Sequence, residues 1–254
     1  MTTNPTLDLL HRHGSVRTYL ADPVSPAMVE QIVHAAQRAS TSSNLQVVSV
    51  VAVADSATRS RLSKISGQTH VAQAPVVLVW CADLRRLDRA CRLRGRTQVT
   101  DYVENFLTCV LDAGIAAQNA AVAAESFGLG VCYLGSIRND VRAVIELLAL
   151  PRLVFPVVGM ALGWPAVPPA SRPRLAVSAV LSWDRYAETS DAALLEYDGI
   201  MAATDIYQRR QVPVPGKPGR LEAYGWLEHC VRRAEQPLRT ELRAALKQQG
   251  FGLE

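Results

Sequence analysis

Residues 101–135 form the stretch that most constrains the fold of this chain. They read DYVENFLTCVLDAGIAAQNAAVAAESFGLGVCYLG, which predicts a helix of about seven turns and then a short buried strand. Asp101 and Glu104 have the spacing of a capping box, and Gly128 and Gly130 supply left-handed stop positions. Apolar side chains recur at helical spacing and become small toward the end of the helix, at positions 103, 107, 110, 114, 117, 121 and 124.

Small side chains let another backbone approach closely, and the opposite face of this helix is also mostly alanine. A helix that is apolar nearly all round is normally buried. The stretch therefore predicts a central buried helix that a second subunit could share. The alternative is an alanine-rich segment that is simply a good helix former.

The composition is that of an ordinary globular protein. The 254 residues are 49% hydrophobic and 20% charged, enough for a core in one large domain or two small ones. The net charge of +4 is modest and no basic stripe is interleaved with aromatic residues, so nucleic acid is not an expected partner. The longest apolar stretch, 153–167, is broken by proline and glycine and predicts no membrane helix.

The five cysteines show no metal-binding spacing, and three of them lie in apolar segments, as reduced core cysteines do. We expect no bound metal. The N-terminus lacks the apolar core of a signal peptide, so we expect a cytoplasmic protein.

Helices and strands alternate irregularly along the rest of the chain. Helical spacing predicts helices over 5–12, 26–39, 57–65 and 139–148, and short apolar runs predict strands over 47–54, 76–82, 131–134 and 155–162. We expect an α+β fold in which helices pack on a mixed sheet. The chain reads as a single domain, 1–254, whose part from about 183 onward is a polar, mainly helical excursion with a flexible loop at 211–220.

Motifs of hydrolases, zinc proteases and nucleotide-binding loops are absent from the sequence. GLGVCYLG at 128–135 follows a helix and precedes a strand, the reverse of the dinucleotide-binding order. Polar residues gather instead at the junctions between predicted elements, as HGSVR at 13–17, STSSNLQ at 40–46, GQTH at 67–70 and SRPR at 171–174. In an extended segment Arg172 and Arg174 point the same way, which suits a phosphate. Each cluster alone is also typical of a capped turn or a solvated loop.

Together and in this order, the clusters resemble the nitroreductase superfamily, in particular its NADPH-dependent flavin reductase and oxygen-insensitive nitroreductase branch. That family carries HRSxR, SSSxxLQ, GxQxHV, AAESLGLGxxYIGxxRN and GWP followed by K/R-P-R. This chain shows HGSVR, STSSNLQ, GQTHVAQAP, AAESFGLGVCYLGSIRN and GWP followed by RPR. The resemblance covers nearly the whole chain. It implies a homodimer with FMN at the subunit interface, which the long central helix helps to form.

The resemblance also assigns residues to the cofactor. Those that match flavin-binding positions are His13, Ser15, Arg17, Thr41, Ser43, Gln46, Gln68, His70, Tyr133, Leu134, Gly135 and Ser136, and Arg172 and Arg174 match the phosphate clamp. Arg17 is expected near the pyrimidine edge of the ring, where it would stabilise negative charge, and no side chain is expected to act as a catalytic base.

For the nucleotide, Arg209 and Arg210 are the nearest matches to an arginine that holds the 2′-phosphate of NADPH in this branch. NADH is the alternative donor. The arginine-rich stretch 85–96 is interpreted either as a solvated face or as further help for the nucleotide.

Two positions depart from the family pattern. Gly14 stands where the family has an arginine expected near the FMN phosphate. A charged hydrogen bond contributes about 1.5 to 3 kcal/mol, so weaker FMN retention is expected unless Arg12 replaces that arginine. Ser136 stands where the family has a second glycine, and its hydroxyl would either crowd the ring or bond to it.

The resemblance implies an FMN-dependent oxidoreductase that passes hydride from NADPH to quinone, nitroaromatic or flavin acceptors by a ping-pong mechanism. Two alternatives stay open. One is a dedicated biosynthetic flavoenzyme of the same fold, and the other is a non-catalytic member that binds flavin or another ligand.

Overall fold

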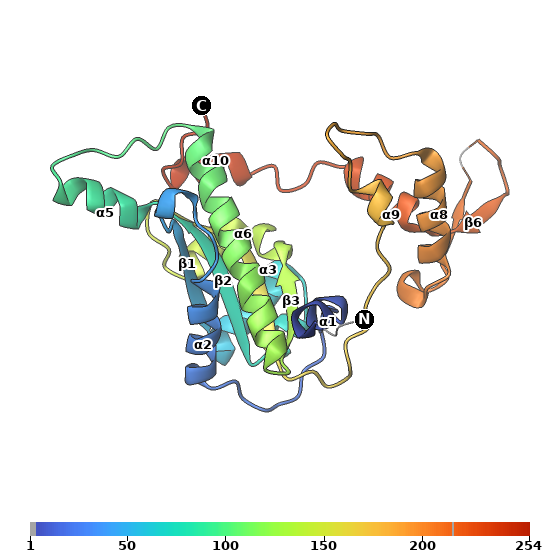
Figure 1. Cartoon of the computed structure of the whole chain (residues 1–254), viewed down its shortest axis with the longest axis horizontal. Coiled ribbons are helices and arrows are strands. Elements are labelled where there is room, and N and C mark those ends of the chain that lie inside the picture. Colours follow the sequence, from blue (N-terminus) through green and yellow to red (C-terminus); the bar gives the residue numbers. More distant parts are fainter. Residues whose placement is uncertain (1–3, 215) are drawn as a thin grey trace. The chain divides into compact units, whose positions relative to one another are not determined.

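The computed structural model describes residues 4–214 and 216–254, and the chain divides into two compact units (Figure 1). The first unit comprises Met1–Ser171 and Arg239–Glu254, and the second comprises Arg172–Leu238. The chain thus leaves the first unit after residue 171 and returns to it for the last sixteen residues. That the whole chain, 1–254, makes a single domain stays a prediction.

The first unit is built on a four-stranded sheet in the order β1-β2-β4-β3. Its strands are β1 (Val48–Val53), β2 (Val76–Asp83), β3 (Gly130–Leu134) and β4 (Val154–Gly163). The α+β class is confirmed, but all three ladders are antiparallel, so the expectation of a mixed sheet is wrong. Apolar runs predict where strands lie and not their direction. Here β2 begins at the same end of the sheet at which β1 ends, and β4 begins where β3 ends. Strands joined in this way run antiparallel.

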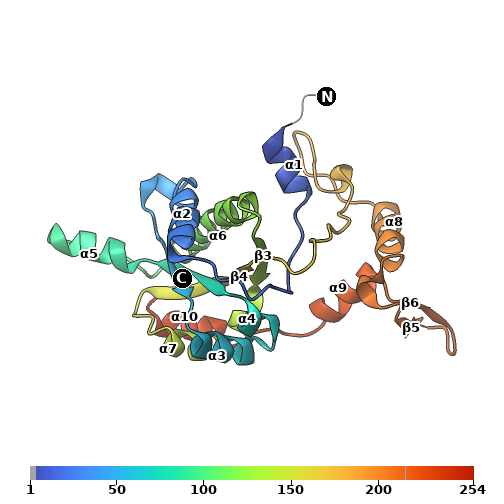
Figure 2. The same ribbon diagram turned by 90° about the horizontal axis from the view of Figure 1, so that it is seen from below.

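Helices cover both faces of this sheet (Figure 2). On one face lie α2 (Pro26–Ala36) and α6 (Val103–Ser126), and on the other lie α3 (Ser56–Ser66), α4 (His70–Gln73), α7 (Val141–Leu147) and α10 (Leu242–Gln248). The remaining helical segments of the unit are α1 (Pro5–His11), η1 (Ser42–Asn44), α5 (Arg85–Leu93) and η2 (Gly135–Arg138). All predicted helices and strands of this unit are found, with ends shifted by a few residues.

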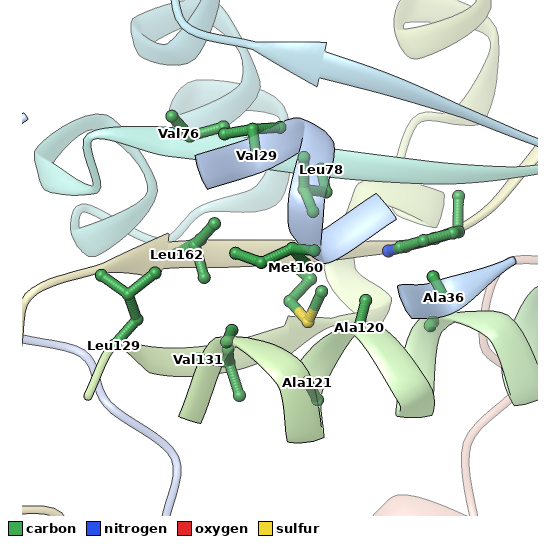
Figure 3. Packing of buried hydrophobic residues seen from close by; sticks show 14 of the residues in the cluster. Val29, Ala36, Val76, Leu78, Ala120, Ala121, Leu129, Val131, Met160 and Leu162 are labelled. Atoms are coloured by element: carbon green, nitrogen blue, oxygen red, sulfur yellow. The ribbon is translucent and has the colours of Figure 1, made fainter. Parts of the chain in front are cut away.

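Alternate side chains of β2 pack on opposite faces, because successive residues of a strand point to opposite sides. Val76 and Leu78 belong to the core cluster that contains α2 and α6, shown in Figure 3, whereas Val77 and Val79 belong to the cluster on the other face. Coverage of both faces explains why β2 is buried along its whole length and reads as one apolar run.

The central helix α6 is confirmed, with a buried row of alanines against the sheet: Ala113, Ala116, Ala117, Ala120, Ala121 and Ala124. Among the described residues it is the one helix long and apolar enough to cross a membrane, judged by length and composition. Because its alanine face forms part of the core of the first unit, we assign α6 as a core helix.

The predicted capping box at the start of α6 is wrong. Tyr102 is the N-cap residue and makes no side-chain cap hydrogen bond. The carbonyl of Asp101 instead accepts the N–H groups of Leu253 and Glu254, at 2.7 and 2.9 Å. Pairing with the C-terminal residues, which lie far away in sequence, therefore holds this end of the helix in place of a local cap.

At the other end of α6, Gly128 has a φ of 84° and is the predicted left-handed stop. The same role for Gly130 is wrong, because Gly130 is the first residue of β3 and is not among the glycines with positive φ. A Cβ at this position would lie 2.4 Å from Cγ2 of Val16. Gly130 is required for a close approach of two segments and not for a turn.

The second unit contains η3 (Val177–Ala179), α8 (Asp191–Ala202), η4 (Asp205–Tyr207), α9 (Trp226–Ala234) and an antiparallel hairpin of β5 (Gln211–Pro213) and β6 (Leu221–Ala223). Its core consists of Tyr197, Met201, Tyr207, Val212 and Tyr224. The loop expected over 211–220 is therefore partly strand, because Val212 is drawn into this cluster. Pro215, within the loop, lies outside the described residues.

Candidate functional site

The loop at 13–17 is anchored to the sheet by one residue. The N–H of Val16 donates to the carbonyl of Val131 in β3 at 2.9 Å, and Val16 is buried. Its neighbours Ser15 and Arg17 are exposed, as expected for an extended segment in which side chains alternate. The anchor therefore leaves two of the predicted cofactor-binding side chains available to a ligand.

His13, at the start of this loop, contacts the end of α6. Its Nδ1 lies 2.6 Å from Oε1 of Glu125. Glu125 belongs to the AAES motif but was not predicted as a site residue. This contact fixes where along the helix the 13–17 loop lies.

His70 and Ser136 carry the polar atoms that best fit a bound ligand. Both side chains are buried, at 9% and 8% exposure. Among the described residues, His70 Nε2 and Ser136 Oγ have no hydrogen-bond partner. Buried polar groups in proteins are nearly always paired, so a ligand such as FMN that completed these bonds would fit the residues present.

Arg17 lies close enough to His70 to act on its charge. Burial lowers the pKa of the His70 imidazole, and the positive charge of Arg17 lowers this pKa further. The loop at 13–17 and the GQTH segment are thereby brought together. Gln68 is partly buried in the same segment, and its N–H donates to the carbonyl of Ser63 at 3.2 Å.

The segment at 133–136 ends β3 and begins η2. Burial raises the pKa of the Tyr133 hydroxyl to about 12, helped by the negative charge of Glu125, so this hydroxyl stays a proton donor at neutral pH. It donates to Oε1 of Gln118 at 3.3 Å. Leu134 is the last residue of β3 and its side chain is buried in the core, so it contributes its backbone to the segment rather than its side chain.

Two guanidinium groups flank Gly135. A Cβ there would lie 3.5 Å from Nη2 of Arg138 and 3.9 Å from Nη2 of Arg239. Burial lowers the pKa of Arg138, and the charge of Arg239 adds to this effect. Arg239 is held by Oδ1 of Asn139, which accepts its Nε–H at 3.2 Å. Arg239 could not be found from the sequence motifs, because only the return of the chain to the first unit brings it here.

Thr41, Ser43 and Gln46 are not placed with these residues. Asp112 on α6 accepts the Thr41 hydroxyl at 2.5 Å, whereas the 13–17 loop contacts α6 at Glu125, thirteen residues later. At 1.5 Å rise per residue the two contacts are about 20 Å apart along the helix. A cavity of about 470 Å³ lies beside Thr41 and Gln46.

The predicted phosphate clamp begins the second unit. Arg172 and Arg174 are both exposed. The carbonyl of Pro173 between them accepts the hydroxyl of Tyr197 from α8 at 2.9 Å. This bond fixes the backbone from which the two side chains extend, and their phosphate-binding role stays a prediction.

Arg209 and Arg210 also belong to the second unit. The guanidinium of Arg210 lies 4.1 Å from the ring centre of Tyr224, and its Nε–H donates to the Tyr207 carbonyl at 3.2 Å. Arg209 adopts a left-handed backbone conformation with a φ of 50°. Their contact with NADPH stays a prediction. The stretch at 85–96 includes α5, which has no buried residue, as expected for a solvated helix.

Gly14 has no room for a side chain. A Cβ at this position would lie 2.6 Å from the carbonyl oxygen of Ala170 and 3.0 Å from its carbonyl carbon. An arginine here would require the Pro-rich loop around Ala170 to move. Arg12 points elsewhere in this structure, since its Nε–H donates to the carbonyl of Asp8 in α1 at 3.2 Å.

We therefore expect Gly14→Ala to lower the free energy of unfolding by about 1–3 kcal/mol, the usual cost of overpacking. The measurement is urea unfolding of both proteins. Gly199→Ala is the matched control, because nothing lies within 4 Å of a Cβ there and the residue is inside α8. Its free energy of unfolding should rise by about 0.5–1 kcal/mol. Equal stability of Gly14→Ala and the parent would show that the loop yields freely.

Because the pKa of His70 is lowered, we expect the protein to lose stability in acid. Because the folded-state pKa is lowered, the unfolded chain takes up a proton below about pH 6.5 where the folded chain does not. The free energy of unfolding should fall as the pH decreases through this range, down to the folded-state pKa. We expect His70→Gln to show a smaller fall between about pH 7.5 and about pH 5 in urea unfolding. His34 is exposed, so His34→Gln should show the same fall as the parent. An identical fall in the free energy of unfolding of the parent and both variants would exclude His70 as a cause of the acid sensitivity.

Comparison with protein families gives the class of this chain. The nitroreductase family matches residues 10–70 and 66–164, and the C-terminal domain of that family matches residues 172–254. The chain belongs to the nitroreductase family. The family predicted from the motif order is confirmed, and so is the prediction of an oxidoreductase of the nitroreductase type.

Individual relatives match along almost the whole chain. It is 36% identical over 249 residues to the oxygen-insensitive NADPH nitroreductase of Salmonella typhimurium, covering 98% of both proteins. It is 33% identical over 254 residues to an NADPH FMN reductase of Bacillus subtilis, again covering 98% of both. The solved structure of NfrA2 from B. megaterium superposes with a TM-score of 0.90 at 35% identity, covering 99% of this chain and 100% of that one.

Proposed function

We propose that the protein is an FMN-dependent oxidoreductase that takes hydride from NADPH and reduces a small aromatic acceptor, such as a quinone, a nitroaromatic or free flavin, by a ping-pong mechanism. NADH is the alternative donor, and a cytoplasmic location is part of the proposal. The observation that carries it is the pair of buried atoms without partners, His70 Nε2 and Ser136 Oγ, in segments whose motifs match flavin-binding ones. The names of the Salmonella and Bacillus relatives, which include NADPH and FMN, support it.

FMN, when bound, supplies the hydride-transfer chemistry, and the residues of the chain bind and orient it. Arg17 is exposed beside His70 and would stabilise negative charge at the pyrimidine edge. His70 and Ser136 would complete their hydrogen bonds on the ligand. Arg172 and Arg174 would hold the phosphate.

A homodimer through α6 is part of this proposal. Val103, Leu107, Leu111 and Ile115 recur every four residues along α6, and their side chains are 53%, 50%, 54% and 44% exposed. A Cβ at Gly114, among them, would meet nothing within 4 Å. An exposed apolar row of this length on a core helix fits a second helix packed against it.

The dimer would also complete the site. A C2 axis pairs the same surface of two subunits. If two copies of α6 pack antiparallel with the axis near residue 118, midway between Asp112 and Glu125, the Thr41 segment of one chain approaches the 13–17 loop of the other. This arrangement would unite two groups of predicted flavin-binding residues that lie about 20 Å apart along one helix.

Arg209 and Arg210 would contact the 2′-phosphate of NADPH. Arg210 already stacks on Tyr224, and a stacked guanidinium keeps its N–H edges available for a phosphate. We assign the stretch at 85–96 no contact with the nucleotide.

An absorbance spectrum of the purified protein with FMN, taken before and after anaerobic addition of NADPH, tests the proposal. We expect a flavin band that NADPH bleaches and an aromatic acceptor restores. A band that NADPH leaves unchanged would rule out this donor. A narrow acceptor profile would favour a dedicated biosynthetic enzyme, and failure to bind FMN would favour a non-catalytic ligand-binding protein.

A further inference from the structure

The polar segment 41–47 adopts a backbone that its residues do not favour. Ser43, Asn44 and Gln46 have φ values of 48°, 56° and 53°, although none is glycine. Residues with side chains adopt this left-handed region at a cost, and such conformations persist only where surrounding contacts fix them. Any function of this segment therefore depends on the contacts that hold its backbone in this conformation.

Asp112 of α6 provides most of these contacts. The residue is only 3% exposed. One carboxylate oxygen accepts the Thr41 hydroxyl at 2.5 Å and the Val47 N–H at 3.3 Å, and the other accepts the Ser42 N–H at 3.1 Å. The Thr41 hydroxyl in turn accepts the Gln46 N–H at 2.9 Å. A single buried carboxylate thus ties both ends of the segment to the central helix.

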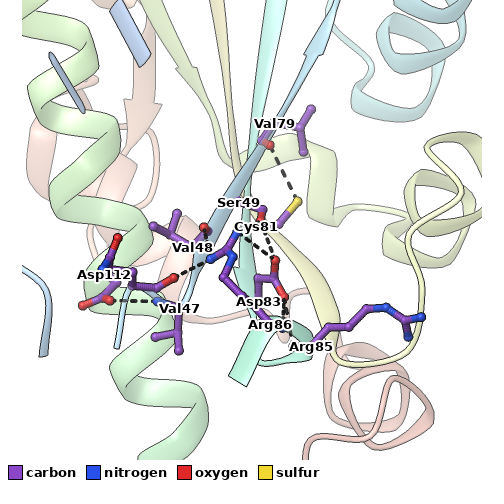
Figure 4. Close-up of polar contacts among 10 residues, drawn as sticks. Val47, Val48, Ser49, Val79, Cys81, Asp83, Arg85, Arg86 and Asp112 are labelled. Carbon is purple, nitrogen blue, oxygen red and sulfur yellow. Dashed lines mark hydrogen bonds and ion pairs between the residues drawn. The ribbon is translucent and has the colours of Figure 1, made fainter. Parts of the chain in front are cut away.

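Arg86 of α5 fixes the same segment from the side of the sheet, as Figure 4 shows. Its Nη1 donates to the carbonyl of Gln46 at 2.6 Å and to that of Val48 at 3.3 Å, and its Nη2 donates to Ser49 Oγ at 3.0 Å. Asp83 accepts the Arg86 N–H at 3.4 Å and lies 3.6 Å from its Nη2. The end of the segment that leads into β1 is therefore held independently of Asp112.

We propose that Asp112 is the positioning residue of the cofactor site: it holds the 41–47 segment, and through it Thr41 and Gln46, in the conformation that contacts FMN. This inference rests on the proposed function. Asp112 itself is buried and acts only through the segment. A carboxylate suits the position because all three of its partners donate hydrogen bonds, and two acceptor oxygens can receive all three.

Asp112→Asn is the first test, because the amide keeps the size but turns an N–H₂ group toward at least one donor. We expect the FMN dissociation constant, measured on the full chain by equilibrium dialysis, to rise about tenfold or more. Asp55→Asn is the matched control. Asp55 caps α3, where it accepts the Thr58 N–H at 2.7 Å, and its substitution should leave FMN binding within about twofold of the parent.

A double-mutant cycle separates positioning from a general structural effect. In a Gln46→Ala background, Asp112→Asn should weaken FMN binding by a clearly smaller factor than in the native background, because one of the two contacts that it positions is already missing. The same fold-change in both backgrounds would overturn the inference. Binding unchanged by Asp112→Asn in the native background would overturn it as well.

Hydrogen exchange in the ligand-free protein gives a second readout. The amides of Ser42, Gln46 and Val47 should exchange at least about tenfold faster in Asp112→Asn, while those of β2 stay protected. If β2 also loses protection, the Thr41→Val and Thr41→Ser pair replaces this variant: the valine should weaken FMN binding and also speed exchange of the Gln46 amide, the serine should do neither, and equal results for both would overturn the inference. Failure of the parent protein to bind FMN overturns the proposed function instead.

Discussion

Replacing Arg172 and Arg174 together by alanine is expected to weaken FMN binding by about 10²- to 10⁴-fold. Each arginine would contribute a charge-assisted hydrogen bond to the phosphate, and such bonds contribute about 1.5 to 3 kcal/mol each. Two of them amount to about 3 to 6 kcal/mol, and each 1.4 kcal/mol corresponds to a tenfold change in the dissociation constant. Equilibrium dialysis with FMN measures the change.

The structure favours a large effect because a hydrogen bond from α8 holds the backbone of this turn. The Tyr197 hydroxyl fixes the carbonyl of Pro173, so less backbone entropy is lost when the arginines bind. Tyr197→Phe, which removes that bond alone, should weaken FMN binding by only about tenfold or less. Arg185→Ala, an exposed arginine in the same unit, is the control for the loss of positive charge.

Riboflavin distinguishes a phosphate clamp from a general effect on the site, because it has the same ring and no phosphate. It should bind the parent and the double variant equally. If both flavins lose affinity to the same extent, Arg172 and Arg174 support the fold of the site and do not hold the phosphate.

Much of the first unit could be predicted because its signals are local. The apolar runs of β1 to β4 and the helical spacing of α6 depend on neighbouring residues, and each predicted element is found. The strand directions and the start of α6 could not be predicted in this way. They depend on pairing between distant segments, such as that of Asp101 with Leu253 and Glu254.

The same distinction between local signals and distant contacts applies to the candidate site. Motif order predicted the 13–17 loop, the GQTH segment and residues 133–136 as parts of one site. The structure joins the 13–17 loop to β3 and brings Arg17 within electrostatic reach of His70. Motifs could not find Asp112, because a single acidic residue in an alanine-rich helix looks like any solvated position until the fold turns it inward. They also missed the crowding at Gly14, which depends on a loop more than 150 residues away.

Leu111→Glu is expected to convert the proposed dimer to monomers. The Leu111 side chain is 54% exposed in the middle of the apolar row on α6. A C2 interface uses the same residue twice, and burying one leucine stabilises by about 1.5–3 kcal/mol. The substitution should therefore raise the dimer dissociation constant by at least about 10²- to 10⁴-fold. Sedimentation equilibrium measures this constant.

Leu195→Glu is the matched control, since Leu195 is 62% exposed and belongs to α8, which is no part of the row. It should leave the dimer intact, and so should Leu111→Met, which keeps the apolar volume. A Leu111→Glu protein that remains as dimeric as the parent would place the interface elsewhere.

The same variant also decides whether one chain holds the whole flavin site. Thr41 is tied to Asp112 and His13 to Glu125, about 20 Å apart along α6. If both groups contact one flavin across the interface, FMN affinity must fall together with dimerisation and recover at protein concentrations that restore the dimer. Monomers that bind FMN as tightly as the parent would show that the 13–17 loop, His70 and Ser136 suffice, and that the 41–47 segment serves another purpose.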